Sequence, residues 1–405
     1  MEFRRTELIQ VGFHGVPSIA IVAGDASGDL YGAALAGALN SLMPGALIWG
    51  AGGPYMRAAG VDLEADFSLV SSIGLVQSSK VIPKLLVSYL RLRSLVAARR
   101  PDVLILIDFG GFNRRLSGFA KRIGIKTAYF IPPGSWRKKD AGAAKTARCA
   151  DLFLSPFPWS AENLRAAGAN AEYVGHPLLD IVAPTVARDR FLKEIGFDDG
   201  VETVALLPGS RKAEVAHVLP ALLDAADIVS RTLEGAVQFV VGAAPAVSEI
   251  VRRAVQRHQS ATPSIGARIV VVGNRTYDAL SSSNLAIITS GTATLEAAIL
   301  GTPMVIVYRG SGAMAVERLF RPGVLERHIG LPNIIAGSEI CPEILGGEAT
   351  GERIAAKSLE LLENGTLREE AKWNLNKVKS QLGQPGAVMR SAELITSLLG
   401  RPAAR

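Results

Sequence analysis

The sequence predicts an α/β protein that contains two doubly wound, Rossmann-like domains. Short apolar runs of strand length alternate with longer helical segments along most of the 405 residues, which is typical of parallel sheets covered by helices. Several runs end in glycine or hydroxyl turns that lead directly into a helix. Because the pattern occurs twice, we expect an N-terminal domain over residues 1–180, a linker over 181–202, a C-terminal domain over 203–375 and a helical segment over 376–405.

Composition narrows the class of protein. A hydrophobic content of 48% fits a globular chain, and no run of apolar residues is long enough to predict a membrane span. The first residues lack the apolar core of a signal peptide, so export is not expected. Cys149 and Cys341 are far apart and lack ligand spacing, which favours reduced, structural thiols in the cytosol. The net charge of +7 is compatible with anionic lipid surfaces or phosphorylated substrates, whereas only 6% aromatic residues argue against nucleic acid.

One stretch predicts an anion site. The apolar run Leu285–Ile288 leads through a hydroxyl turn into the helical run Ala293–Leu300, and Met304–Tyr308 predicts the next strand. Such a unit places a helix N-terminus at the carboxyl end of a parallel strand, where amides and the helix dipole attract phosphate. Glu296 would repel phosphate, but it could accept hydrogen bonds from ribose hydroxyls. The alternative interpretation is an ordinary capped helix, in which the negative charge of Glu296 only interacts favourably with the helix dipole.

The N-terminal half offers carboxylates at equivalent positions. Ser18–Ala23 predicts a buried strand followed by a turn that holds Asp25 and Asp29, and the turn lacks the dinucleotide pattern G-x-G-x-x-G. The two aspartates could hold a sugar or act as a base, or they could be turn formers and an N-cap. Asp108 follows the strand Asp102–Ile107, at the end where active sites of α/β proteins gather.

Arg211 follows the strand predicted over Thr203–Leu207. Its guanidinium is fixed in charge and fork-shaped, and at the carboxyl end of a strand it suits a diphosphate. An ordinary surface arginine is the alternative.

Residues 67–100 mix apolar residues with Lys80, Lys84, Arg91 and other basic residues, and they contain no acid. A basic and apolar segment of this kind suggests contact with an anionic membrane surface. A packed helix with a basic outer face explains the same pattern.

Several motifs in order resemble those of the lipid-A-disaccharide synthase family, over about Ile19 to Leu399. The Gly24–Asp29 turn is similar to the family's GEASGD, with Asp25 in place of its glutamate, and Ser290–Glu296 matches the family's SGTATLE unchanged. The other matching motifs are Gly52–Met56, Ile73–Val76, Val174–Leu178, Leu206–Arg211 and Leu331–Asn333.

The resemblance implies a GT-B-type glycosyltransferase fold that binds UDP in its C-terminal domain. It implies transfer of 2,3-diacylglucosamine from a UDP-diacylglucosamine donor to a phosphorylated, acylated glucosamine acceptor, 2,3-diacylglucosamine 1-phosphate. It also implies a peripheral enzyme on the cytoplasmic face of the inner membrane, which uses no metal or other cofactor and forms a homodimer. The candidate UDP-binding residues are Arg211, Ser290, Gly291, Thr292, Ala293, Thr294, Glu296 and Asn333.

The departures from the family lie in the N-terminal half. The family's IDAPDFN is Ile107–Asn113 here, and Gly111 stands where the family has the aspartate that it needs for activity. The tryptophan-rich loop is one residue shorter over Ile131–Arg137. We therefore take Asp108, Asp25 and Asp29, in that order, as candidates for the base that accepts the acceptor's proton. The candidate residues on the acceptor or membrane side are Gln77, Trp136, Arg137, Lys80, Lys84 and Arg91.

Three alternatives stay open on the sequence. These departures also fit a UDP-sugar transferase with another lipid acceptor, or a catalytically inert UDP-sugar-binding paralogue. A sugar-nucleotide 2-epimerase shares a Gly-His-Pro near the domain junction, but its other motifs fit less well. His176 in that tripeptide is expected to be a buried structural histidine.

Overall fold

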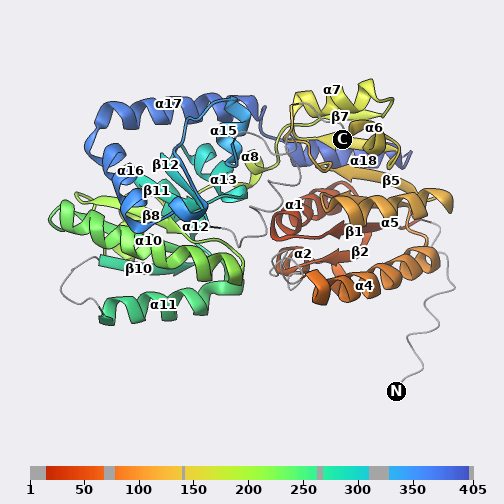
Figure 1. Cartoon of the computed structure of the whole chain (residues 1–405). Coiled ribbons are helices and arrows are strands. Elements are labelled where there is room, and N and C mark those ends of the chain that lie inside the picture. The colour runs from red at the N-terminus through yellow and green to blue at the C-terminus, as the bar shows by residue number, and fades with distance from the viewer. Residues whose placement is uncertain (1–14, 68–77, 139–141, 262–267, 310–327, 401–405) are drawn as a thin grey trace, which may run out of the picture. The chain divides into compact units, whose positions relative to one another are not determined.

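The computed structural model describes residues 15–67, 78–138, 142–261, 268–309 and 328–400. The chain divides into two compact units. Unit 1 holds the described residues up to Asp180 together with those from Gly383 onward, and unit 2 holds those between Ile181 and Leu382. The prediction of two doubly wound α/β domains is confirmed, since each unit contains one parallel sheet with helices packed against it (Figure 1).

The sheet of unit 1 has the strand order β3-β2-β1-β4-β5-β6-β7, and all of its described pairings are parallel. Its central strands are buried apolar runs, because helices cover both of their faces. The strands are β1 (Ser18–Ala23), β2 (Leu47–Gly52), β3 (Asp62–Asp66), β4 (Val103–Ile107), β5 (Lys126–Phe130), β6 (Leu152–Ser155) and β7 (Ala171–Tyr173).

The helices of unit 1 include one from the far end of the chain. Helix α18 (Ala387–Leu398) packs against α1 (Ala26–Leu42), and Figure 1 shows its blue ribbon among the warm colours of the N-terminal half. Asp180 anchors it by accepting hydrogen bonds from the amides of Gly386 and Val388 at the start of the helix. The other helices are α2 (Pro54–Ala58), α4 (Ser78–Arg99), α5 (Gly110–Arg122), α6 (Ala143–Ala147), α7 (Pro158–Ala166) and α8 (Leu178–Ile181), the last at the junction of the units.

The sheet of unit 2 has the order β10-β9-β8-β11-β12-β13 and is also parallel. Its strands are β8 (Glu202–Leu207), β9 (Val237–Ala243), β10 (Arg268–Gly273), β11 (Leu285–Thr289), β12 (Met304–Tyr308) and β13 (Glu343–Leu345). Its helices are α9 (Arg188–Glu194), α10 (Lys212–Thr232), η3 (Pro245–Val247), α11 (Ser248–Ala261), α12 (Thr276–Ser281), α13 (Thr292–Leu300), α15 (Leu331–Ala336), η4 (Gly346–Glu348), α16 (Gly351–Glu363) and α17 (Gly365–Gln381).

The domain limits differ from those expected after residue 180. The segment expected as a linker belongs to unit 2, where the Asp278 carboxylate accepts hydrogen bonds from the Thr185 amide and hydroxyl at 2.6 and 2.7 Å. Helix α17 runs across the boundary expected at residue 375, and the chain leaves unit 2 only at Leu382. None of the helices in the described ranges has the length and apolar character needed to cross a bilayer.

Each sheet has one point where the strand order reverses direction. In unit 1 it lies between β1 and β4, and in unit 2 between β8 and β11. Ligands of open parallel sheets bind outside the carboxyl ends of the strands at such a switch point. The turns that follow these four strands are therefore the first places to look for a functional site.

Candidate functional site

The switch point of unit 2 contains the predicted strand–turn–helix unit. Helix α13 begins at Thr292, directly after β11 and the turn residues Ser290 and Gly291. The turn is held by the Ser290 hydroxyl, which donates to the Ile329 carbonyl at 2.9 Å, and by the Thr294 hydroxyl, which donates to the Gly291 carbonyl at 2.8 Å. A Cβ placed on Gly291 would meet no described atom within 4 Å, so a ligand can approach this backbone closely.

Glu296 and Thr289 add polar groups beside that helix start. Burial raises the pKa of Glu296 to about 7, and the Tyr277 hydroxyl of α12 contacts its carboxylate at 3.5 Å. The Thr289 hydroxyl is buried at the end of β11 and has no hydrogen-bond partner within the described ranges. Sequence reasoning passed over Tyr277, because only the fold brings α12 to this place.

Arg211 lies at the end of the loop that follows β8 and caps α10. Its guanidinium donates to the Glu214 carboxylate at 2.8 Å, and the Arg211 amide donates to the same carboxylate at 3.3 Å. Gly209 permits this loop, because its φ of +107° suits glycine and a Cβ there would lie 2.8 Å from a Glu214 carboxylate oxygen. The guanidinium is half exposed, at the same sheet edge as the α13 start.

Asn333 holds a loop of unit 2 in place through its side-chain hydrogen bonds. Its Nδ2 donates to the Cys341 carbonyl and to a Glu343 carboxylate oxygen, each at 2.8 Å. Its Oδ1 accepts from the amides of Ile340 and Cys341, each at 2.9 Å. These four bonds use the hydrogen-bonding capacity of a buried amide. Asn333 therefore fixes the loop that leads into β13.

Asp108 occupies the switch point of unit 1, directly after β4. It adopts a left-handed backbone conformation with φ of +41°, and Phe109 follows with φ of +51°. Burial, with a smaller contribution from the negative charge of Asp25, raises the pKa of the Asp108 carboxyl to about 7. A carboxyl of this kind is poised to exchange a proton near neutral pH.

Asp25 and Asp29 hold different places in the turn after β1. Asp25 is the N-cap of α1, where its carboxylate accepts from the Gly28 amide at 2.7 Å, yet its charge also reaches Asp108. Asp29 is buried and accepts from the amides of Gly53, Tyr55 and Met56 at 2.7 to 3.0 Å, so it closes the start of α2. The structure thus brings Asp25 and Asp108 together and engages Asp29 elsewhere.

Gly111 lies in the first turn of α5, with open space in front of it. A Cβ placed there would come no closer than 4.0 Å to the described atoms, the nearest being Arg115 Nη1. An aspartate side chain would therefore fit at position 111.

Trp136 and Arg137 follow β5 at the same edge of the sheet. The Arg137 guanidinium carbon lies 4.8 Å from the centre of the Trp136 ring, a cation–π contact. Arg137 Nε is buried, and the described residues offer it no hydrogen-bond acceptor. An N–H group left in this way points to an anion as its missing partner.

Helix α4 buries some of its apolar side chains and exposes others. Leu92 and Val96 are buried, whereas Leu86, Val87 and Leu90 are 55%, 65% and 49% exposed. Arg91 pairs with Glu64 of β3 at 3.2 Å. Gln77 and the side chains of Lys80 and Lys84 lie outside the described residues.

His176 is a structural histidine in this fold. It is 5% exposed, and burial lowers its pKa to about 3, so the ring is neutral at physiological pH. Its Nδ1 accepts from the Leu178 amide at 3.2 Å. The ring therefore stabilises the turn before α8.

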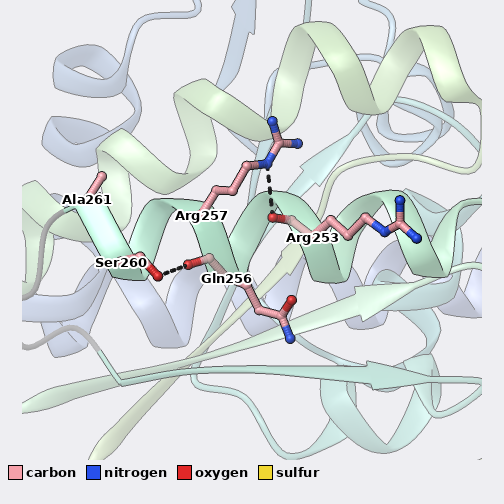
Figure 2. Close-up of a pocket in the computed structure, with 5 residues that line it drawn as sticks. All are labelled: Arg253, Gln256, Arg257, Ser260 and Ala261. Carbon is pink, nitrogen blue, oxygen red and sulfur yellow. Dashed lines mark hydrogen bonds between the residues drawn. The ribbon is translucent and has the colours of Figure 1, made fainter.

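None of the residues that line a surface pocket of about 540 Å³ is a predicted site residue. Figure 2 shows that its five lining residues come from the last turns of α11. Arg257 Nε donates to the Arg253 carbonyl at 3.2 Å, and the Ser260 hydroxyl donates to the Gln256 carbonyl at 2.9 Å. No cluster of three metal-ligating side chains occurs among the residues described.

Sequence comparisons with known proteins match one family over nearly the whole chain. A family model described as lipid-A-disaccharide synthetase matches residues 19–396. Lipid-A-disaccharide synthase from Syntrophus aciditrophicus is 38% identical over 382 residues, which are 94% of this chain and 97% of that protein. The protein of the same name from Geobacter metallireducens is 36% identical over 385 residues, 95% of this chain and 97% of the relative.

Solved structures show the same fold at low sequence identity. UDP-GlcNAc 2-epimerase from Neisseria meningitidis, bound to UDP-GlcNAc, has a TM-score of 0.60 at 12% identity and covers 95% of this chain and 99% of its own. An epimerase structure from Listeria monocytogenes has the same TM-score at 14% identity, with 95% and 97% covered. The two units thus form a fold of the GT-B type.

Proposed function

The chain belongs to the lipid-A-disaccharide synthetase family and is a glycosyltransferase, and we propose that it transfers 2,3-diacylglucosamine from UDP to 2,3-diacylglucosamine 1-phosphate. The product is the β-1,6-linked disaccharide, formed with inversion at the anomeric carbon. The observation that carries this proposal is the switch point of unit 2, where Arg211 and the start of α13 follow two adjacent strands. Such a site suits a diphosphate leaving group.

Unit 2 holds the donor in this proposal. Arg211 and the amides at Gly291 and Thr292 bind the diphosphate and stabilise the charge that grows on it as the glycosidic bond breaks. Glu296 accepts hydrogen bonds from the ribose hydroxyls. Asn333 acts through the loop it braces. Fixed donors of this kind act without reorganisation during the reaction, because the fold has already oriented them.

Unit 1 holds the acceptor. The 6-hydroxyl of the acceptor attacks the anomeric carbon, and Asp108 accepts its proton. Burial, aided by the charge of Asp25, raises the pKa of Asp108 to about 7, which supports this role. Arg137, whose Nε finds no acceptor among the described atoms, binds the 1-phosphate of the acceptor. Neither role requires a metal ion, and we propose that the reaction proceeds without one.

The acyl chains of both substrates are expected to remain in a membrane. Leu86, Val87 and Leu90 are exposed on α4 near basic side chains, which supports peripheral contact with the cytoplasmic face of the inner membrane. The homodimer that the family resemblance implies is a separate proposal, to be measured by sedimentation of the purified chain.

The test uses the full-length chain with UDP-2,3-diacylglucosamine labelled in the sugar, and 2,3-diacylglucosamine 1-phosphate as acceptor. We expect a labelled disaccharide monophosphate and free UDP in equal amounts. Uptake of UDP without any transfer would indicate an inert UDP-sugar-binding paralogue. Transfer to another lipid but not to this acceptor would indicate a related transferase.

A further inference from the structure

We propose that Tyr129 and Asn113 are positioning residues that hold the main-chain carbonyl of Asp108 and thereby aim its carboxyl. The catalytic consequence rests on the proposed function, in which Asp108 is the base. The geometric claim concerns only how these side chains fix the turn after β4.

Two donors from different elements meet at one carbonyl oxygen. The Tyr129 hydroxyl of β5 donates to the Asp108 carbonyl at 2.7 Å. Asn113 Nδ2 of α5 donates to the same oxygen at 3.0 Å and to the Ile107 carbonyl at 3.0 Å. Both side chains are fully buried, with no exposed surface. Side chains that donate to the last carbonyls of a strand determine how the chain leaves it.

The turn needs such support because its backbone is strained. Asp108 and Phe109 are consecutive left-handed residues, with φ of +41° and +51°. A left-handed conformation is unfavourable for a residue other than glycine, and such residues persist where the surroundings over-determine them. Phe109 also packs its ring on Gly24, where a Cβ would lie 2.1 Å from the ring.

Asn113 also carries a buried polar atom without a partner among the described residues, and its positioning role explains why an amide stands here. Its Oδ1 is buried and lacks a hydrogen-bond partner among the residues described. Leaving a buried acceptor unsatisfied is unfavourable. The amide is useful here because its N–H groups reach the carbonyls at the end of β4.

Tyr129 offers a clean test because its ring is fixed independently of its hydroxyl. The ring stacks on Phe153 with centroids 6.1 Å apart and planes inclined by 8°. Phenylalanine therefore fills the same space and removes only the O–H group. The titratable groups that act on the Asp108–Tyr129 pair are Asp25 at the start of α1, Arg114 of α5 and Cys149 before β6.

The experiment compares Tyr129→Phe with Tyr173→Phe in the full-length protein. Tyr173 is a partly exposed tyrosine at the end of β7 and serves as the matched control. Aspartate labelled with ¹³C at the carboxyl reports the titration midpoint of Asp108, which Asp108→Asn assigns, and Asp151 serves as the internal reference. For Tyr129→Phe we expect the Asp108 midpoint to fall by about one pH unit, since a released carboxyl gains access to water. We also expect kcat to fall about tenfold with an unchanged KM for the donor.

Two outcomes separate this inference from the proposed function. An Asp108 midpoint and a kcat that match those of Tyr173→Phe would overturn the positioning role. Full transfer by Asp108→Asn would instead remove Asp108 as the base, while the titration would still decide whether Tyr129 aims it. If Tyr129→Phe is too unstable to purify, Asn113→Ser removes the other donor and is judged by the same midpoint.

Discussion

At the switch point of unit 2 the two central strands lead into an arginine and a helix start, whereas at that of unit 1 they lead into two aspartates. The topology is the same, with adjacent parallel strands that diverge into loops. In unit 2 the side chains pair with near neighbours, as Arg211 does with Glu214, and the backbone is open. In unit 1 the carboxyl of Asp108 is partly buried near another acid and sits on a strained turn.

The difference shows how one fold supports two kinds of chemistry. A helix start and a guanidinium stabilise negative charge without any change in protonation. Two neighbouring acids in a buried site raise the affinity for a proton instead. The fold supplies the position, and the residues in four short turns supply the function.

The strongest test of this difference between the units is to remove the proposed base. Asp108→Asn should lower kcat by about 10²- to 10⁴-fold, the range usual for a general base. UDP binding, measured by calorimetry, should stay within twofold of the original, since unit 2 is unaltered. A loss of UDP affinity would mean that the variant acts through misfolding. Asp29→Asn should instead lower stability, because Asp29 holds three amides at the start of α2.

The open position at Gly111 offers a gain-of-function test. Gly111→Asp in the Asp108→Asn background should restore transfer at least tenfold, because a carboxylate at position 111 has room beside the same turn. Gly111→Asn is the matched control and should restore nothing. Equal activity of the two double variants would show that position 111 does not reach the reacting hydroxyl.

Removal of the charge of Arg211 in unit 2 should weaken the binding of UDP. Arg211→Ala should weaken UDP binding about 10- to 100-fold, the range expected for a charged hydrogen bond to a diphosphate. Arg211→Lys should recover part of that loss, because it keeps the charge without the planar fork. Arg253→Ala on α11 removes a more exposed arginine, which also pairs with a glutamate of its own helix and lies far from the switch residues in the sequence, and it should leave the calorimetric affinity unchanged.

The pH dependence of kcat should report on Asp108 of unit 1. Because the base must be ionised and the pKa of Asp108 is about 7, kcat should fall about tenfold per pH unit below 7. Stability should change in the opposite sense. A carboxyl whose pKa is raised on folding favours the folded state below its unfolded pKa near 4, and that contribution is lost as the pH rises towards 7. Asp108→Asn should flatten the rate profile, as measured by initial rates. It should also reduce the slope of the stability profile, as measured by urea titration, to the part contributed by carboxyls such as Glu296, whose pKa is likewise raised to about 7.

The smallest expected effect concerns the membrane. Leu86→Ser with Val87→Ser should weaken binding to anionic vesicles several-fold, because both side chains lose apolar area that would otherwise be buried in lipid. Ile250→Ser, an exposed apolar residue of unit 2, is the control. Vesicle co-sedimentation measures both variants, and equal retention would remove α4 from the proposed contact surface.

The sequence predicted the sheets well where their strands are apolar. Runs such as Leu285–Ile288 and the strand before Asp108 were found because buried parallel strands are continuously hydrophobic. Strand β3 was missed, because its sequence DLEAD is polar and lies at the edge of the sheet. Edge strands bury little area, so their pattern resembles a loop.

The site was predicted only as far as its residues are adjacent in the sequence. The turn before α13 was found in full, since strand, turn and helix follow one another along the chain. The contacts from Tyr129 and Asn113 to Asp108 join three elements and have no period or spacing that would reveal them. The bracing position of Asn333 likewise became visible only with its partners in the loop before β13.

The place of α18 in the chain affects when unit 1 can complete its fold during synthesis. Helix α1 of unit 1 is covered by a helix that follows the whole of unit 2 along the chain. The described sequence of unit 2 lies between the two helices and is therefore synthesised before α18. The nascent first part of unit 1 must wait with an apolar helix face uncovered until α18 has been synthesised, a period in which a chaperone has a surface to hold.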